Sequence, residues 1–555
     1  MQMRDALDHY KWGEKFDETR FEEEQHHRRH KMPSEVVVFT VAAALLMLVF
    51  ALLQTFFKSA TSNDSQCPKG KTPPGPASSF LIGNMMELTH DHLPIHLTQL
   101  AQRYGRIYQL KCGNTCMVVL NSTEVIREAL VKKWSDFAGR PLSFTGDVVS
   151  GGGRSISLGD YNNEWRAHRR LVHGALLRCC HDSLHGLIEK QGLHLCKVLK
   201  AYQGSAVDLS NDFTVAASNV ITTLTFGKEY DKSSSELQEL HNCLNEIVAL
   251  WGSCWISALD SFPLLRRLPN PVFSHLMQEV TKRDNIIRKH LKDFKSQDNK
   301  PESIISRYFL QGLDTKNGVL LTDIHVHMAT VDLLIGGTET TAALLNWTIA
   351  FLLHRPEVQN QVYEELCTVP EGHYPKYSER HKLPVLTALI NEVLRLRPVA
   401  PLAVPHRAIR DSSIAGYYIP KNTVIIPNLF GAHHDPSVWT EPDSFKPGRI
   451  YFLENERNKL YFLLQQTSQF CLSERFLEGG GASPRALIPF GGGARLCLGE
   501  SVAKIELFLF TAYLLRDFHF FPTDACLPDL RGVASVVLKV KAYKVIACPR
   551  PVHDN

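Results

Sequence analysis

The sequence predicts a mainly α-helical domain with a smaller β-rich part, an α+β architecture, preceded by one N-terminal transmembrane helix. The chain has 555 residues, 44% hydrophobic and 21% charged, so it can bury one large core. Segments of helical character dominate, while short β-like runs occur at 106–113, 117–122 and 535–547. An uncharged apolar run at 36–57 is as long as a membrane-spanning helix.

Composition argues against nucleic acid as a partner. The formal charge is +4 at pH 7, and no long run of Lys and Arg interleaves with aromatic residues. The 13 cysteines are irregularly spaced and form no Cys-x-x-Cys pair of the kind found in structural zinc sites or redox dithiols. We therefore expect free thiols in a reducing compartment.

The apolar run predicts a membrane anchor over residues 35–58. At about 1.5 Å per residue it crosses roughly 30 Å of hydrocarbon. A cleaved signal peptide usually has a shorter apolar region, so a retained anchor is favoured over cleavage in the residues that follow. Prolines and a glycine within 59–76 then predict a stiff hinge before the catalytic domain at 77–555.

Orientation depends on where the working protein begins. The basic run at 26–31 would hold the N-terminus in the cytosol and send the large domain across the membrane. If translation begins at Met32, the positive charges follow the span instead, which places the large domain in the cytosol. We interpret residues 1–31 as a spurious or disordered upstream extension, and we expect a membrane-anchored protein with its large domain in the cytosol.

The run "PFGGGARLCLGE" at 489–500 places a lone cysteine, Cys497, in a glycine-rich loop. A structural turn around a buried thiol is one interpretation. A phosphate-binding loop is disfavoured because the Gly-Lys-Ser/Thr ending is missing. The third interpretation is a thiolate that binds haem iron, since glycines let backbone N–H groups approach the sulfur and stabilise its charge.

This loop resembles the haem-binding loop of the cytochrome P-450 superfamily, written F-x-x-G-x-R-x-C-x-G. The matching residues are Phe490, Gly493, Arg495, Cys497 and Gly499. The resemblance implies the cytochrome P-450 fold, haem b as cofactor, Cys497 as the axial thiolate and metal ligand, and Arg495 at a haem propionate.

Residues 329–354 look at first like a second membrane span. Asp332 and Glu339 argue instead for a long buried helix, because charge in lipid is costly. Gly336 and its neighbour Gly337 are explained either by close helix packing or by space left for a flat cofactor. The run "GGTETT" resembles the family's oxygen-activation segment, which implies that Thr340 takes part in oxygen activation and Glu339 in proton delivery.

Two further motifs resemble parts of the family's haem pocket. Glu392 and Arg395 lie one helical turn apart, a spacing that in isolation indicates only a weak surface pair. The family's E-x-x-R motif implies a buried pair completed by a later arginine, Arg449 or Arg475. Trp165 and Arg169 could belong to a solvated basic helix face, and His406 could be structural; the resemblance implies that all three contact haem propionates.

One segment departs from the family pattern. The family runs directly from its F-x-P-x-R stretch into "FLE", whereas this chain interposes residues 450–475, which are rich in apolar side chains. We interpret this segment as a retained intron or gene-model error, with a genuine surface loop as the alternative. The insertion leaves open whether the chain is a catalytically silent haem-binding isoform.

Longer stretches resemble the family's vertebrate steroid hydroxylases, among them 131–141, 325–342 and 394–420. The resemblance implies hydroxylation of progesterone and 17-hydroxyprogesterone at C21, or alternatively attack at C17. It also implies a steroid 3-keto contact at Arg266, and four residues near the reacting end of the substrate: Asp332, Gly336, Ala400 and Leu402.

The expected partners are the steroid, O₂, the membrane and an NADPH-dependent cytochrome reductase that supplies electrons. Arg166, Arg170 and Lys504 could form a basic docking face for the reductase, although a solvated charged surface is nearly as good an interpretation.

Overall fold

The computed structural model describes residues 70–79, 82–113, 115–182, 184–296, 321–370, 372–447, 486–523 and 527–551, together with Met47. Met1–Pro68 and Lys69–Asn555 form separate compact units, and all described residues except Met47 belong to the second. The predicted N-terminal extension, the insertion at 450–475, Arg449, Arg475 and all of the anchor except Met47 lie outside the described residues. Within the described residues, no helix has the length and apolar character that a membrane crossing requires.

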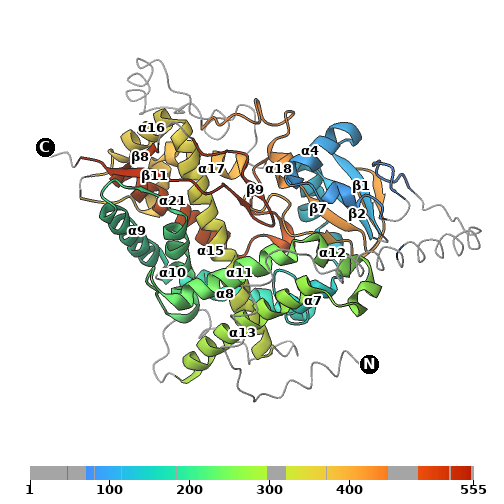
Figure 1. Cartoon of the computed structure of the whole chain (residues 1–555). Helices are drawn as coiled ribbons and strands as arrows, with labels where there is room; N and C mark the ends of the chain where they lie inside the picture. The colour runs from blue at the N-terminus through green and yellow to red at the C-terminus, as the bar shows by residue number, and fades with distance from the viewer. Residues whose placement is uncertain are drawn as a thin grey trace, which may run out of the picture. The chain divides into compact units, whose positions relative to one another are not determined.

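The second unit is mainly helical, as predicted (Figure 1). Its α-helices are α4 (Leu93–Tyr104), α5 (Thr123–Arg127), α6 (Trp134–Phe137), α7 (Phe144–Val149), α8 (Asn163–Asp182), α9 (Leu184–Ala201), α10 (Ser210–Phe226), α11 (Ser235–Trp251), α12 (Cys254–Ser261), α13 (Pro271–Ser296), α15 (Asp323–His354), α16 (Pro356–Leu366), α17 (Pro384–Leu396), α18 (Leu429–His433) and α21 (Glu500–Asp517).

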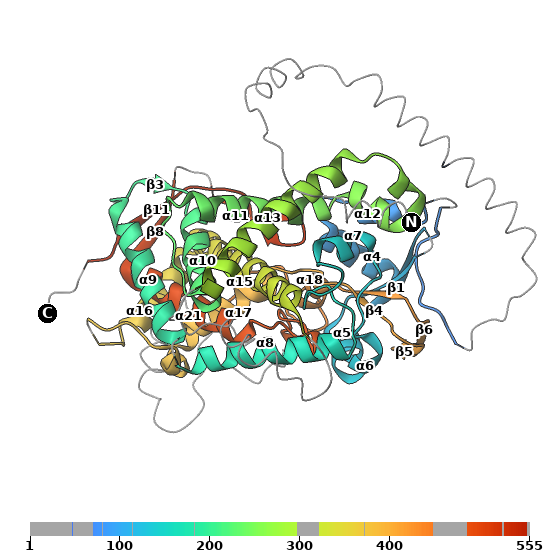
Figure 2. The same ribbon diagram turned by 90° about the horizontal axis from the view of Figure 1, so that it is seen from below.

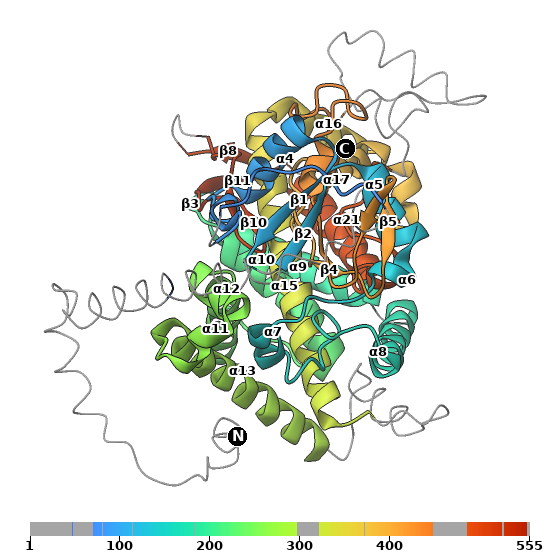
Figure 3. The ribbon, with the colours of Figure 1, turned by 90° about the vertical axis from the view of Figure 1, so that its right-hand side faces the viewer.

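The β-rich part is built around a four-stranded sheet of order β1-β2-β7-β4, beside α4 in Figure 3. β1 pairs antiparallel with β2, β2 parallel with β7, and β7 antiparallel with β4. A second sheet has the order β3-β11-β8, and two pairs of short strands complete the set. The strands are β1 (Ile107–Cys112), β2 (Thr115–Leu120), β3 (Ala206–Val207), β4 (His406–Arg407), β5 (Ser412–Ile414), β6 (Tyr417–Ile419), β7 (Val424–Pro427), β8 (Phe518–Pro522), β9 (Val533–Ala534), β10 (Leu538–Lys539) and β11 (Val545–Pro549).

The predicted β runs are confirmed at β1 and β2. The C-terminal run at 535–547 divides between β10 and β11, which lie in different sheets. Gly532, just before β9, has a left-handed φ of +74°, and a Cβ there would press on the Lys539 carbonyl and the Trp347 ring. The hairpin of β9 and β10 thereby packs on the central helix.

The central helix is α15, which the sequence predicted to be buried in the protein. It begins at a capping box formed by Thr322 and His325 and ends just before Pro356, which opens α16. Helix α15 contacts α10, α17 and α21, and Figure 2 shows it at the centre of the helical part. Its side chains are buried on nearly all faces from Thr341 to Leu353, which explains its uniformly apolar sequence.

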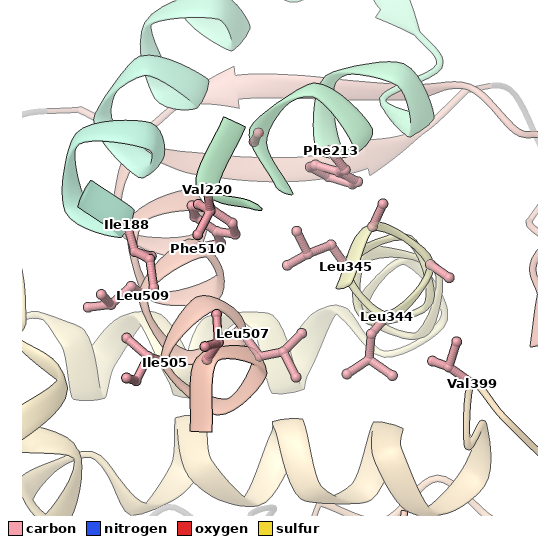
Figure 4. Packing of buried hydrophobic residues seen from close by; sticks show 14 of the residues in the cluster. Ile188, Phe213, Val220, Leu344, Leu345, Val399, Ile505, Leu507, Leu509 and Phe510 are labelled. Atoms are coloured by element: carbon pink, nitrogen blue, oxygen red, sulfur yellow. The ribbon is translucent and has the colours of Figure 1, made fainter. Parts of the chain in front are cut away.

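Figure 4 shows how this core is filled. Leu344 and Leu345 project from α15, Leu507 and Phe510 from α21, and Val220 from α10, toward a shared interior. These five side chains belong to one continuous hydrophobic cluster, the largest part of the core. The packing fixes the middle of α15 relative to α21, the helix that follows Cys497.

The two glycines of α15 have different surroundings. A Cβ on Gly337 would collide with Cγ1 and Cδ1 of Ile221 on α10, so glycine permits close helix packing there. At Gly336, by contrast, no atom lies within 4 Å of the position that a Cβ would take, and the residue is exposed. Close helix packing therefore explains Gly337, while the space beside Gly336 leaves room for a flat cofactor there as a prediction.

The Glu392–Arg395 pair is fully buried on α17. Both N–H···O bonds between the guanidinium and the carboxylate measure 2.9 Å. Arg395 also donates to the carbonyls of His433 and Pro442 at 2.8 and 2.7 Å, and Glu392 accepts the backbone N–H of Lys446 at 3.1 Å. The pair therefore fastens the 442–446 segment to the core, as the family motif implied.

We expect Glu392→Ala to destabilise the folded chain by about 3–5 kcal/mol, because it leaves the Arg395 guanidinium buried without its counter-charge. The control is Glu357→Ala, which removes a half-exposed carboxylate paired with Arg355 and should cost no more than about 1 kcal/mol. Denaturant unfolding followed by tryptophan fluorescence measures both. Equal, small effects of the two substitutions would contradict the stabilising role of the Glu392–Arg395 pair.

The two glycines allow a second, matched test. Gly337→Ala should lower stability by about 1–3 kcal/mol through overpacking against Ile221, whereas Gly336→Ala should leave it unchanged or raise it by up to about 1 kcal/mol through helix propensity. Unfolding midpoints of the two variants report the difference. Adding Ile221→Ala should relieve the strain at position 337, and absence of this rescue would show that the packing explanation is wrong.

Candidate active site

The loop around Cys497 requires glycine at Gly493. Gly493 has a left-handed φ of +66°, and a Cβ there would collide with the carbonyl oxygen of Leu130. Leu130 lies in a π-helical turn, Glu128–Lys132, that packs against the short 3₁₀ helix Gly493–Arg495. The Cys497 N–H donates to the carbonyl of Phe490 at 3.0 Å and closes the loop. The thiol is thereby held at the start of α21.

The Cys497 thiol is accessible on one side, yet protein encloses it on the others. Desolvation raises the pKa of this thiol, while a hydrogen bond from the backbone N–H of Gly499 and the charge of Arg169 lower it. A lone thiol does not overcome this desolvation. Metal coordination does, because a bound cation deprotonates a coordinating thiol outright.

Positive charge accumulates beside this thiol. The Arg495 guanidinium lies 3.8 Å from the centre of the Trp165 ring, and the Arg169 guanidinium lies 5.6 Å from it. Burial and the neighbouring Arg140 lower the pKa of Arg495, and burial and Arg169 do the same to Arg140. The Asp160 carboxylate accepts from Arg407 and from the backbone N–H of Arg140, and its charge acts against the lowering of the pKa of Arg140 and Arg495 without reversing it.

The donor set fits haem. A thiol with N–H support, a cluster of one buried and two partly buried arginines and the open face of Gly336 match an iron ion, two propionate anions and a flat macrocycle. Cys497 would hold the iron, and the arginines would hold the propionates.

Individual pocket residues have other partners in this structure. Arg495 donates to the carbonyls of Ala138, Ile156 and Gly159, which use three of its five N–H groups. The Trp165 indole N–H donates to Ile156 at 2.9 Å, and Arg169 donates to the carbonyl of Leu496. Trp165 therefore supports the arginines through its ring face.

His406 is buried, and its Nδ1 lies 2.8 Å from the carbonyl oxygen of Phe137. Burial, and secondarily the charge of Arg140, hold the pKa of His406 well below its usual value. An imidazole that donates from Nδ1 has no second proton to give unless it is protonated. A hydrogen bond from His406 to a haem propionate would therefore require a negatively charged group close enough to raise the pKa of His406.

Glu339 and Thr340 lie next to each other on α15 but engage different groups. The Thr340 hydroxyl donates to the carbonyl of Gly336 at 2.6 Å. Glu339 forms an ion pair with Lys539 of β10 and lies 3.7 Å from Nδ1 of His241. Burial lowers the pKa of His241, although the Glu339 charge acts against it.

A cavity of about 270 Å³ lies between α11, α15 and the β9–β10 hairpin. Its wall is largely apolar, with Leu244, Val248, Leu334 and Val537 among its lining residues, and Glu339 lies at its edge. None of the five predicted steroid contacts lines this cavity. His241, Asn245, Glu339 and Lys539 also line a second, more polar cavity of similar size.

The predicted substrate residues are dispersed. Arg266, in the 3₁₀ turn Pro263–Arg267, donates to the carbonyl of Leu259 and lies 4.7 Å from the centre of the Phe144 ring. Asp332 accepts hydrogen bonds from Ile156 N–H and the Ser157 hydroxyl, and burial raises its pKa to about 6. Ala400 and Leu402 are partly exposed in the segment between α17 and β4.

Sequence reasoning missed Arg140, His241 and Lys539. Arg140 lies in a stretch noted for its resemblance, but no local pattern separates it from surface arginines. Lys539 follows an apolar strand run, where a lysine usually marks a solvated face. Only the tertiary fold brings these side chains to Arg495 and Glu339.

The comparisons with known proteins agree with this geometry. The family model described as Cytochrome P450 matches residues 73–547. Steroid 21-hydroxylases from Homo sapiens and Mus musculus are each 41% identical to this chain, covering 85% of it and 91% of their own length. A solved zebra fish cytochrome P450 with progesterone has a TM-score of 0.70 and 33% identity, covering 82% of this chain and 99% of its own. The chain belongs to the cytochrome P450 family of haem-thiolate monooxygenases.

Proposed function

We propose that this protein is a steroid 21-monooxygenase, which hydroxylates C21 of progesterone and 17-hydroxyprogesterone to give 11-deoxycorticosterone and 11-deoxycortisol. The observation that carries the proposal is the 41% identity with the human steroid 21-hydroxylase across 85% of the chain. The matched region is far longer than the haem loop.

Bound haem b would supply the oxidising chemistry: with O₂, two electrons and two protons, one oxygen atom enters a C–H bond and the other leaves as water. The chain holds this group through Cys497 Sγ on the iron and through Arg140, Arg169 and Arg495 on the propionates. Trp165 orients two of these arginines through its ring face. His406 completes the propionate contacts in its protonated form.

Proton delivery is the proposed role of Glu339 and Thr340. The Thr340 hydroxyl holds a proton on the side of α15 that exposes Gly336, where it now donates to the helix carbonyl. The Glu339 carboxylate lies at the edge of two cavities, which gives it access to water. Lys539 and His241 keep that carboxylate oriented between proton transfers.

Substrate orientation is assigned to a mostly apolar pocket with few polar contacts, as a rigid steroid requires. Arg266 would donate to the 3-keto oxygen after turning from the Leu259 carbonyl. Gly336, Ala400 and Leu402 would shape the space around C21. Asp332 would shape this space indirectly, because its carboxylate already accepts hydrogen bonds from the Ile156 N–H and the Ser157 hydroxyl.

The proposal includes a membrane setting and an electron donor. Residues 35–58 would anchor the chain in the endoplasmic reticulum membrane, with the catalytic domain in the cytosol. Electrons would come from the NADPH-dependent reductase of that membrane, which would dock on the exposed side chains of Arg166, Arg170 and Lys504. Attraction to an acidic partner surface is the physical basis of this assignment.

Hydroxylation at C17 is the second candidate. It comes from the family resemblance, and a zebra fish cytochrome P450 of similar fold, solved with progesterone, shows that a fold of this kind binds the steroid that both reactions would use. The two reactions use the same cofactor chemistry and differ in which carbon approaches the iron, so local pocket shape decides between them.

Incubating the purified protein with progesterone, NADPH and reductase should yield 11-deoxycorticosterone, identified by mass spectrometry against standards. Cys497→Ser should abolish this product, because a hydroxyl does not replace the thiolate donor. Cys367→Ser, which changes an exposed free cysteine, should retain it. Predominant 17-hydroxyprogesterone would favour the second candidate, and no oxidised steroid would indicate a silent isoform.

A further inference from the structure

A group of potential metal ligands lies well away from Cys497 in the sequence, near the start of the β-rich part. Glu87 is in the 3₁₀ helix Met85–Leu88, His90 is in the following loop, and His96 is near the start of α4. Each offers one ligand atom, and the three atoms all lie within 4.8 Å of one another. Figure 3 shows α4 beside the four-stranded sheet.

The three side chains already contact one another. His96 Nε2 lies 2.5 Å from Glu87 Oε2, and the rings of His90 and His96 stack with centroids 3.7 Å apart and planes 19° apart. A hydrogen bond between Glu87 and His96 explains the first contact. It does not explain why a second imidazole lies against the first.

The backbone beneath this group is well supported. Asn84, just before the 3₁₀ helix, donates to the carbonyl of Ala77 at 3.1 Å and accepts the Lys111 N–H of β1 at 2.9 Å. The His96 N–H donates to the carbonyl of His92 at 3.1 Å. The ligands therefore come from anchored elements, as a preorganised site requires.

Local charge favours a cation. Residues 72–102 contain no Lys or Arg, and their two charged side chains are Glu87 and Asp91. No ammonium or guanidinium from this segment competes for the carboxylate. Two imidazoles and a carboxylate form a ligand set that suits zinc, with bonds of about 2.0–2.2 Å.

We propose that Glu87, His90 and His96 bind a zinc ion, with water in the remaining position. Tetrahedral bonds of about 2.0–2.1 Å place ligand atoms roughly 3.3 Å apart. The 2.5 Å contact between Glu87 and His96 must therefore lengthen, and the exposed side chain of His90 must turn out of its stack on His96 to point a ring nitrogen at the ion. The ion would join the 3₁₀ helix, the loop and α4 where the chain enters the fold. This site is independent of the proposed steroid activity.

The test measures zinc binding by the full haem-loaded chain through competition with a chromogenic chelator. His26, His27 and His30 near the N-terminus could also bind metal, so every variant carries Asn at these three positions. That background should bind one zinc ion per chain. His90→Ala and His96→Ala should each weaken zinc binding by at least an amount on the order of 10- to 100-fold, which is the loss typical when a residue that only supports a metal ligand is removed.

His92→Ala is the matched control, because it removes an imidazole from the same loop that is not one of the three ligands; it should leave affinity unchanged. Zinc should also slow amide hydrogen exchange in residues 85–97 of the background chain and not in His90→Ala. Equal affinity in His90→Ala, His92→Ala and the background would overturn the site. Unchanged exchange in residues 85–97 at saturating zinc would overturn it as well.

Discussion

A cluster of three guanidiniums, one buried and two partly buried, with little negative charge around it imposes the main constraint on this fold. Arg140, Arg169 and Arg495 lie close enough for repulsion to add to the cost of burying them, and Asp160 is committed to other donors. Isolated buried charge is expensive unless a counter-ion pairs with it. A dianionic cofactor supplies that counter-charge, and the thiol of Cys497 lies where such a cofactor would meet a metal ligand.

The surrounding elements hold these groups in fixed positions. The carbonyl of Leu130 admits only glycine at position 493, which sets the cysteine loop against the β-rich part. Leu507 and Phe510 fix α21 against α15, so the thiol and the open face of Gly336 belong to one packed unit. The Glu392–Arg395 pair fastens the segment before the haem loop. Each of these three contacts has a polar or steric requirement that few other residues meet.

Motifs with several fixed residues were predictable from the sequence, and single long-range contacts were not. The glycine-rich loop, the buried α15 and the pairing of Glu392 with Arg395 all follow from local spacing or from the family resemblance. The partners of Arg140 and Glu339 come from elements far away in the chain, such as Val404 for the former and Lys539 for the latter. No sequence period encodes such contacts, because the tertiary fold alone brings them together.

The central claim is that Cys497 binds haem iron as a thiolate while the arginine cluster neutralises the propionates. Carbon monoxide difference spectroscopy of the purified, reduced protein tests it most directly. The account predicts the red-shifted absorption that distinguishes thiolate-bound haem, lost in Cys497→Ser and kept in Cys367→Ser. Haem that binds without this shifted band, or a band that survives removal of the Cys497 sulfur, would contradict the account.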